Sequence, residues 1–186
     1  MNTGKASADT GRSFNGDYST GAGPCRAIVS VCNHRTLGFD QDSTKVPQFT
    51  ILIAGCKAQD LHRFRRALES TKLVVDVQMH MASDGGTALD DVLAGVYPKP
   101  NLILLDCETR GEFSLEIVRA LKGNSKTRNI PLIALAQPGD DLYVEDLYRC
   151  QANCVLPKPQ TVEGATALFT RIEQFWFRVA ALPVLR

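Results

Sequence analysis

Short apolar runs alternate with segments of helical period along most of the chain. Each run has the length of a strand, and in the segments between them apolar residues recur every three or four positions, as on one face of a helix. This alternation predicts an α/β fold: a doubly wound, five-stranded parallel sheet of flavodoxin-like order between two helical layers, that is, a three-layer sandwich. The predicted strands are 49–54, 74–81, 102–105, 132–136 and 154–156.

The character of each run indicates its place in the sheet. Residues 102–105 are apolar on both faces and are expected to form the central strand, whereas residues 74–81 alternate between apolar and polar and are expected near an edge. The last helix is expected to be long and to begin at Thr161, whose hydroxyl suits a helix cap.

The first 47 residues lack this pattern. Gly, Ser, Thr, Asn and Asp dominate residues 1–24, which cannot bury enough apolar surface to offset the entropy of ordering. Residues 27–32 are apolar enough for a short strand. We predict an N-terminal extension over 1–47 that is largely disordered, followed by one folded domain over 48–186 with an extended C-terminal helix.

Composition and charge narrow the classes of function. The 186 residues are 44% hydrophobic and 22% charged, as in a globular domain, and 21 Lys and Arg balance 20 Asp and Glu, so no overall field attracts nucleic acid or anionic lipid. No apolar run is long enough to span a bilayer, and the N-terminus lacks the apolar core of a signal peptide. We expect a cytoplasmic protein that binds neither DNA nor membrane.

Candidate chemistry gathers where the parallel strands end, because ligands of such sheets bind beyond the carboxyl ends of the strands. Two charged residues stand there: Asp106 after the central strand, and Lys158 between two prolines after the last strand. A carboxylate at this place is either functional or a loop and capping residue. Lys158 can reach it across the top of the sheet, or it can be a solvated surface lysine.

The segments around these two residues resemble the receiver domain of two-component response regulators. The tail of the chain is similar in particular to the small, stand-alone regulators that partner bacterial phytochromes. The resemblance covers residues 49–183. The segments that carry it are 104–106, 130–135, 152–159, the turn Asp84-Gly85 with Ala88-Leu89, and the tail 172–183.

The resemblance implies a role in a phosphorelay. Asp106 would be the phosphoacceptor, taking its phosphoryl group from the phosphohistidine of a sensor histidine kinase, with a phytochrome as the expected kinase. Lys158 would contact the acyl-phosphate oxygens as a point charge. The peptide bond before Pro159 is expected to be cis.

The chain departs from the family at four positions. Receivers place two acidic residues after the first strand to hold Mg²⁺, but Gly55 and Cys56 stand there, and neither supplies a carboxylate ligand. Metal binding is therefore expected to be weak or absent, and no cofactor is expected. The hydroxyl and aromatic residues of the family's conformational switch are replaced by Ala136 and Val155.

Three residues beside the strand ends allow two interpretations each. Lys57 can supply fixed positive charge in place of the metal, or it can begin the first helix and face water. The thiols of Cys56 and Cys107 can be redox-active beside lysines, or they can pack as small hydrophobes. The six cysteines form no CxxC pairs, which indicates reduced thiols and no zinc site.

The last helix has more apolar surface than one domain covers. One stripe suits packing on the sheet, and a second recurs every seven residues on a neighbouring face. The resembling regulators dimerise through this end, so we expect a two-fold homodimer through Leu168, Phe175, Trp176 and Leu182. Alternatively, the two aromatic residues fold back under residues 28–31.

These features favour a stand-alone, degenerate response regulator receiver, not an enzyme, whose output passes through protein–protein contacts. The alternative is a pseudo-receiver that acts as a dimeric interaction or scaffold module without phosphorylation, with Asp106 retained for structure. A third class, a redox or enzymatic α/β domain that uses Cys56, lacks a phosphate-binding glycine loop and a nucleophile–base pair.

Overall fold

The computed structural model shows one mixed sheet. It describes residues 26–31, 48–71, 76–82, 85–96, 98–107 and 112–183. The strands of this part of the chain are β1 Arg26–Val31, β2 Gln48–Ala54, β3 Asp76–Ala82, β4 Leu102–Asp106, β5 Leu132–Ala136 and β6 Cys154–Pro157. Their order across the sheet is β1-β3-β2-β4-β5-β6.

Strands β2 to β6 are parallel to one another. Ile53 of β2 lies opposite Met81 of β3 on one side and Leu104 of β4 on the other, and Leu104 in turn lies opposite Ile133 of β5. Strand β6 completes the set beside β5. The strand order reverses between β2 and β4, as in flavodoxin-like sheets. The predicted five-stranded parallel sheet is therefore confirmed.

The sixth strand, β1, comes from the predicted N-terminal extension. It runs antiparallel to β3, from Arg26 opposite Ala82 to Val31 opposite Val77. The short strand considered at residues 27–32 is thus present as β1, because its backbone pairs with the outer edge of β3. The other residues of the predicted extension lie outside the described part of the chain.

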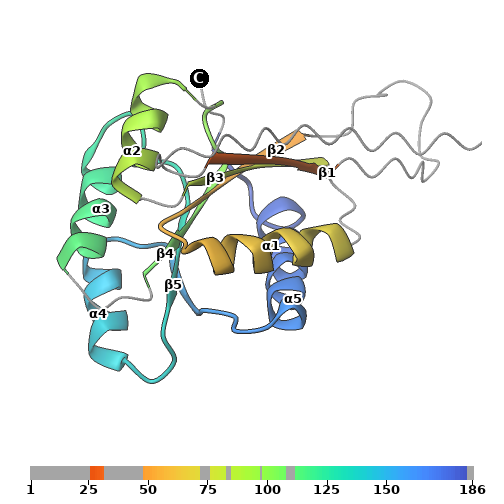
Figure 1. Cartoon of the computed structure of the whole chain (residues 1–186). Helices are drawn as coiled ribbons and strands as arrows, with labels where there is room; N and C mark the ends of the chain where they lie inside the picture. Colours follow the sequence, from red (N-terminus) through yellow and green to blue (C-terminus); the bar gives the residue numbers. More distant parts are fainter. Residues whose placement is uncertain are drawn as a thin grey trace, which may run out of the picture.

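Helices cover both faces of the sheet. The helices of the described residues are α1 Ala58–Ser70, α2 Gly85–Ala94, α3 Glu112–Gly123, α4 Asp141–Arg149, α5 Val162–Ile172 and a π-helical turn, η1 Glu173–Phe177. Helices α1 and α5 lie on one face, and α2, α3 and α4 lie on the other, which gives the predicted three layers (Figure 1). None of these helices is long and apolar enough to cross a membrane.

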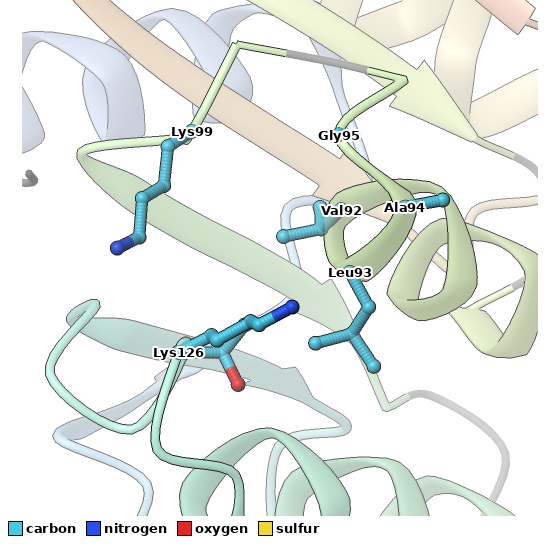
Figure 2. Close-up of a pocket in the computed structure, with 7 residues that line it drawn as sticks. Val92, Leu93, Ala94, Gly95, Lys99 and Lys126 are labelled. Atoms are coloured by element: carbon cyan, nitrogen blue, oxygen red, sulfur yellow. The ribbon is translucent and has the colours of Figure 1, made fainter.

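A pocket of about 420 Å³ opens where strands β4 and β5 begin, away from the strand ends that carry the candidate chemistry. It lies between the end of α2 and the loop that leads into β5 (Figure 2). Its lining combines aliphatic side chains with two lysines, and none of the predicted site residues takes part. The lining residues are Val92, Leu93, Ala94, Gly95, Lys99, Lys126 and Thr127.

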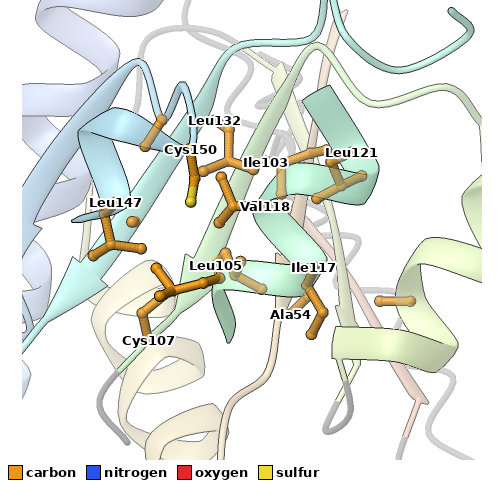
Figure 3. Close-up of a cluster of buried hydrophobic side chains, with 14 of the residues drawn as sticks. Ala54, Ile103, Leu105, Cys107, Ile117, Val118, Leu121, Leu132, Leu147 and Cys150 are labelled. Atoms are coloured by element: carbon orange, nitrogen blue, oxygen red, sulfur yellow. The ribbon is translucent and has the colours of Figure 1, made fainter. Parts of the chain in front are cut away.

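The central strand β4 is buried on both faces, as its uniform apolar run predicts. On the side of α1 and α5, Leu104 belongs to the same core cluster as Phe64 and Phe169, whose rings meet edge to face at 5.9 Å. On the other side, Ile103 packs in a second cluster with Val118 of α3 (Figure 3). Two apolar layers therefore fix β4 and the residue that ends it.

The last helix begins where it was predicted. The Thr161 hydroxyl caps α5 by accepting a hydrogen bond from the Gly164 N–H at 3.1 Å. The α-helix ends at Ile172, and η1 carries the chain on to Phe177, which stacks on Phe49 of β2 with ring centroids 4.4 Å apart. This stack ties the end of the helix to the first parallel strand.

Gly55 makes a tight turn directly after β2. Its φ is +78°, which residues with a side chain rarely adopt, and a Cβ at this position would lie 2.9 Å from the Asp106 carbonyl oxygen. The backbone of β4 and the turn after β2 therefore approach more closely than a side chain permits. This geometry has no room for the acidic residue that the family places here.

Replacing Gly55 by alanine is expected to destabilise the protein. The unfavourable φ and the contact with the Asp106 carbonyl should lower the free energy of unfolding by about 1–3 kcal/mol. The matched control is Gly123→Ala at the end of α3, where nothing lies within 4 Å of the added Cβ. Urea unfolding measures both variants, and equal stabilities would contradict the prediction.

Candidate functional site

Asp106 and Lys158 meet at the carboxyl edge of the sheet. Asp106 ends β4, and Lys158 follows β6, where its N–H donates a hydrogen bond to the Ala136 carbonyl at 2.8 Å. Lys158 Nζ lies 2.7 Å from Oδ2 of Asp106, and the two side chains are 0% and 3% exposed. Lys158 thus reaches the Asp106 carboxylate across the top of the sheet, and the alternative of a solvated surface lysine is wrong.

A buried carboxylate that the sequence analysis did not single out completes the site. Asp60, in the first turn of α1, places its Oδ2 2.7 Å from the same Lys158 ammonium. Its Oδ1 lies 2.6 Å from Nη1 of Arg63, and this nitrogen also donates to the Pro159 carbonyl at 3.1 Å. The sequence signal for Asp60 is an acidic residue three positions before an arginine, which is equally typical of an ordinary helix start.

These residues form what we call the ion cluster: Asp60, Arg63, Asp106 and Lys158. Carboxylates and cations alternate in direct contact from β4 to the surface of α1. Their order is Asp106, Lys158, Asp60 and Arg63. Burial of a single charge is unfavourable, and pairing with hydrogen-bonded partners offsets that penalty. The ion cluster balances its formal charges with groups of this chain alone.

The residues beside the ion cluster do not fit the Mg²⁺ that the receiver resemblance implies. Gly55 has no side chain, Cys56 is buried, and the Lys158 ammonium lies between the two carboxylates. Mg²⁺ requires a near-octahedral set of oxygen ligands. No three His, Cys, Asp or Glu side chains converge as metal ligands in the described part of the chain. The cation that this geometry supplies to Asp106 is Lys158.

The thiols of Cys56 and Cys107 are buried on either side of Asp106. Burial raises the pKa of Cys56 well above its usual range, and the Asp106 carboxylate raises it further. Burial, together with the same carboxylate, raises the pKa of Cys107 to about 12. A reactive cysteine needs a thiolate and access to solvent. The structure therefore favours packing over redox chemistry for both residues.

The residues at the two positions of the family's conformational switch have neither the hydroxyl nor the aromatic group of that switch. Ala136 is buried at the end of β5 and offers only a methyl group. Val155 is partly buried in β6, where its N–H donates a hydrogen bond to the Tyr148 hydroxyl at 3.2 Å. Neither side chain can donate a hydrogen bond to a phosphoryl group on Asp106.

The structure decides two predictions about neighbours of the ion cluster: the place of Lys57 and the isomer of the peptide bond before Pro159. Lys57 is exposed at the N-cap position of α1, in agreement with the helix-start interpretation. The bond between Lys158 and Pro159 is trans, so the prediction of a cis bond is wrong. The trans form is the intrinsically favoured isomer before proline, and in this geometry the Pro159 carbonyl accepts its hydrogen bond from Arg63.

The four residues predicted for a dimer interface do not form one exposed face. Leu168 is buried in the core, because this side of α5 packs within the chain, so its assignment to the interface is wrong. Trp176 is partly buried, Leu182 is half-buried and Phe175 is 54% exposed. Phe175 and Trp176 meet edge to face at 5.2 Å. The alternative contact with residues 28–31 involves side chains outside the described set.

The raised thiol pKa values predict that stability falls at alkaline pH. Thiols of the unfolded chain ionise near pH 9, whereas that of Cys107 in the folded chain stays protonated up to about pH 12, so rising pH favours the unfolded state in between. The free energy of unfolding should fall by up to about 1.4 kcal/mol per pH unit for each such thiol.

Cys107→Ala is expected to reduce this slope, as measured by urea unfolding at several values above pH 9. Cys154→Ala is the matched comparison and should reduce the slope less, because that thiol is only partly buried and its pKa is raised by burial alone. A slope that is the same in Cys107→Ala as in wild type would contradict the assignment.

The chain is similar in sequence to a known response regulator. Response regulator Rcp1 of Synechocystis sp. is 27% identical over 146 residues, which cover 76% of this chain and 97% of Rcp1. No family model matches the chain.

Solved structures of response regulators share the fold. The Mn²⁺-bound form of Rcp1 superposes with a TM-score of 0.62 at 24% identity, covering 73% of this chain and 99% of Rcp1. The phosphorylated cyanobacterial phytochrome response regulator RcpA gives 0.64 at 21% identity, covering 74% and 100%. Response regulator RPA3017 of R. palustris, in red light signalling, gives 0.64 at 22% identity, covering 73% and 98%.

The fold, the strand ends and the sequence comparison all resemble those of response regulators. The parallel strands have the receiver order, and Asp106 and Lys158 meet at the edge of the sheet where the resemblance places them. The similarity to Rcp1 extends over nearly the whole of that regulator. We therefore conclude that the chain has the fold of a response regulator receiver and is similar in sequence to response regulator Rcp1.

Proposed function

We propose that the protein is a stand-alone, degenerate receiver in a cytoplasmic two-component phosphorelay, and that Asp106 accepts a phosphoryl group without a divalent cation. The observation that carries this proposal is the Lys158 ammonium 2.7 Å from the Asp106 carboxylate. A charged hydrogen-bond donor at this distance supplies positive charge where the acyl phosphate would form. The receiver contributes this charge from its own chain.

The proposed reaction is transfer from a phosphohistidine. An Asp106 carboxylate oxygen attacks phosphorus, the new O–P bond forms as the N–P bond breaks, and the electron pair of that bond returns to the imidazole of the donor. Lys158 stabilises the negative charge on the phosphoryl oxygens during the transfer. The reaction modifies the receiver once and leaves it as a signalling module rather than an enzyme.

A sensor histidine kinase is the proposed donor, with a phytochrome as the proposed kinase class. RcpA is a cyanobacterial phytochrome response regulator, and RPA3017 is a regulator in red light signalling, which supports this partner. Rcp1 has been solved in a Mn²⁺-bound form. This chain carries Gly55 and Cys56 after β2, and for that reason the proposal assigns the charge to Lys158 instead of a metal.

The proposed output passes through contacts with another protein, not with DNA. The family reports phosphorylation through movements of a hydroxyl residue and an aromatic residue. Ala136 and Val155 stand at these two positions and have neither group. A change at Asp106 must therefore act through groups that touch it directly. One such group is Lys158, which also contacts α1 through Asp60.

Incubation with acetyl phosphate is expected to phosphorylate the wild type equally with Mg²⁺ and with a chelator, because Lys158 supplies the charge. Intact mass spectrometry measures the phosphoryl adduct. Asp106→Asn should give none. Asp141→Asn, at an exposed position of α4, is the matched control and should behave as wild type. An adduct that forms only with Mg²⁺ would contradict the metal-independent reaction.

A second candidate function is a pseudo-receiver that binds its partner without phosphorylation. The observation in its favour is the burial of the Asp106 side chain beneath Lys158, with only 3% of it exposed. Under this candidate, Asp106→Asn leaves partner binding intact, whereas under the first it abolishes signalling. The absence of an adduct with both acetyl phosphate and a phosphorylated kinase would favour the pseudo-receiver.

We also propose a homodimer through the C-terminal segment that follows α5, formed by Phe175, Trp176 and Leu182. Phe175 is 54% exposed and Val179, four residues later, is 74% exposed, so two apolar side chains face solvent at this end. Neighbouring exposed apolar side chains of this kind favour a protein interface. A two-fold pairing would cover both copies of the patch with the same residues.

Phe175→Asp is expected to convert the dimer to a monomer, because the introduced carboxylate would be buried without a partner in the interface. Sedimentation equilibrium or light scattering after gel filtration measures the mass. Leu142→Asp, which changes an exposed leucine of α4, is the matched control and should remain dimeric. A wild type that is monomeric at high concentration would disprove the dimer.

A further inference from the structure

We propose that Asp60 is a positioning residue of the phosphoacceptor site, which holds the Lys158 ammonium against Asp106 so that an internal cation stands in for a divalent metal. This proposal rests on the proposed function of Asp106. It assigns a role to a carboxylate of α1 that lies outside the strand-end motifs and contacts the same Lys158 ammonium as Asp106.

Lys158 needs a second partner to stay on Asp106. Lysine has a flexible stem and a strongly hydrated charge, so a lone strand-end lysine is expected to turn toward water. Its neighbour Pro157 is exposed, yet Lys158 Nζ is fully buried and lies 2.7 Å from Oδ2 of both Asp60 and Asp106. The second carboxylate adds an ionic contact that the ammonium would lose on leaving.

Asp60 is itself oriented by Arg63. Nη1 of Arg63 holds Oδ1 of Asp60 at 2.6 Å, which leaves Oδ2 for Lys158. The same nitrogen donates to the carbonyl of Pro159, the residue after Lys158, at 3.1 Å. The contacts therefore close a ring from Asp60 through Lys158 and Pro159 to Arg63 and back. A closed ring of hydrogen bonds restricts each member more than separate pairs do.

The packing of α1 on α5 sets the distance between Asp60 and Lys158. Phe64, one turn after Asp60, is fully buried and meets Phe169 of α5 edge to face at 5.9 Å. Further along, the hydroxyls of Ser70 and Thr166 lie 3.2 Å apart. Because α5 directly follows the segment that carries Lys158, these contacts bring the start of α1 to the lysine.

The groups that face Asp106 allow the role of Asp60 to be tested by the direction in which the pKa of Asp106 shifts. Lys158 comes from the segment after β6, Asp60 from α1, and the thiols of Cys56 and Cys107 from the ends of β2 and β4. Both thiols have raised pKa values and are neutral at ordinary pH. Lys158, in contact with Asp106, and Asp60, in contact with Lys158, are charges that act on Asp106 in opposite directions.

The test is the direction in which the pKa of Asp106 moves in Asp60→Asn. If Asp60 positions Lys158, the ammonium leaves Asp106 and the pKa of Asp106 rises by about one pH unit or more. If Asp60 is only a neighbouring negative charge, Lys158 stays and the pKa falls. Titration of the aspartate carboxyl carbons by ¹³C NMR, assigned with Asp106→Asn, gives the direction.

Two variants control for the loss of a carboxylate as such. Glu69→Gln removes an exposed carboxylate from the same helix and should leave the pKa of Asp106 unchanged. Asp60→Glu keeps the charge and should restore the wild-type pKa more closely than Asp60→Asn does. If Asp60→Asn does not fold, Arg63→Gln, which loosens Asp60 from a partly exposed position, should raise the pKa of Asp106 by a smaller amount.

A fall or no change in the pKa of Asp106 overturns the proposal. The titration uses the unphosphorylated full chain, so its result is independent of whether Asp106 accepts a phosphoryl group. A rise without any adduct from acetyl phosphate or kinase would uphold Asp60 as the residue that holds Lys158 and reject the phosphoacceptor role. An adduct together with a fall would do the reverse.

Discussion

The Lys158 ammonium between Asp60 and Asp106 is the interaction on which the site depends. All three side chains are buried, and each comes from a different element: β4, α1 and the segment after β6. Without the lysine, two carboxylates would share a buried site with like charges, which is unfavourable. Without either carboxylate, the lysine would lose one of its ionic contacts. The contacts therefore support one another and hold three elements of the fold together.

The rest of the fold serves to bring these partners within contact distance. Two apolar clusters, one on each face, hold β4 in the middle of the sheet, so Asp106 has a fixed position. The tight turn at Gly55 lies against the backbone of Asp106 where the family carries an acidic side chain. A close backbone contact and an internal cation thus occupy the region that serves metal binding in the resembling receivers.

Much of this architecture could be predicted from local pattern. Strand period, helix period and the polar residues that follow each apolar run placed the five parallel strands, Asp106 and Lys158 correctly. Other features depended on contacts that local pattern does not encode. The pairing of β1 with β3 required an open strand edge, the burial of Leu168 depended on which face of α5 met the sheet, and the trans bond at Pro159 accompanies a carbonyl contact with a distant arginine.

The sequence by itself determined the order of strands and helices, because periodicity is a property of neighbouring residues. It also determined which charged side chains stand at strand ends, because a parallel sheet brings those ends to one edge. Only the tertiary structure decided that Asp60 belongs to the site. Asp60 and Lys158 are 98 residues apart, and their contact arises from the packing of α1 on α5. A helix-start aspartate and a buried ionic partner have the same local pattern, so only long-range packing distinguishes them.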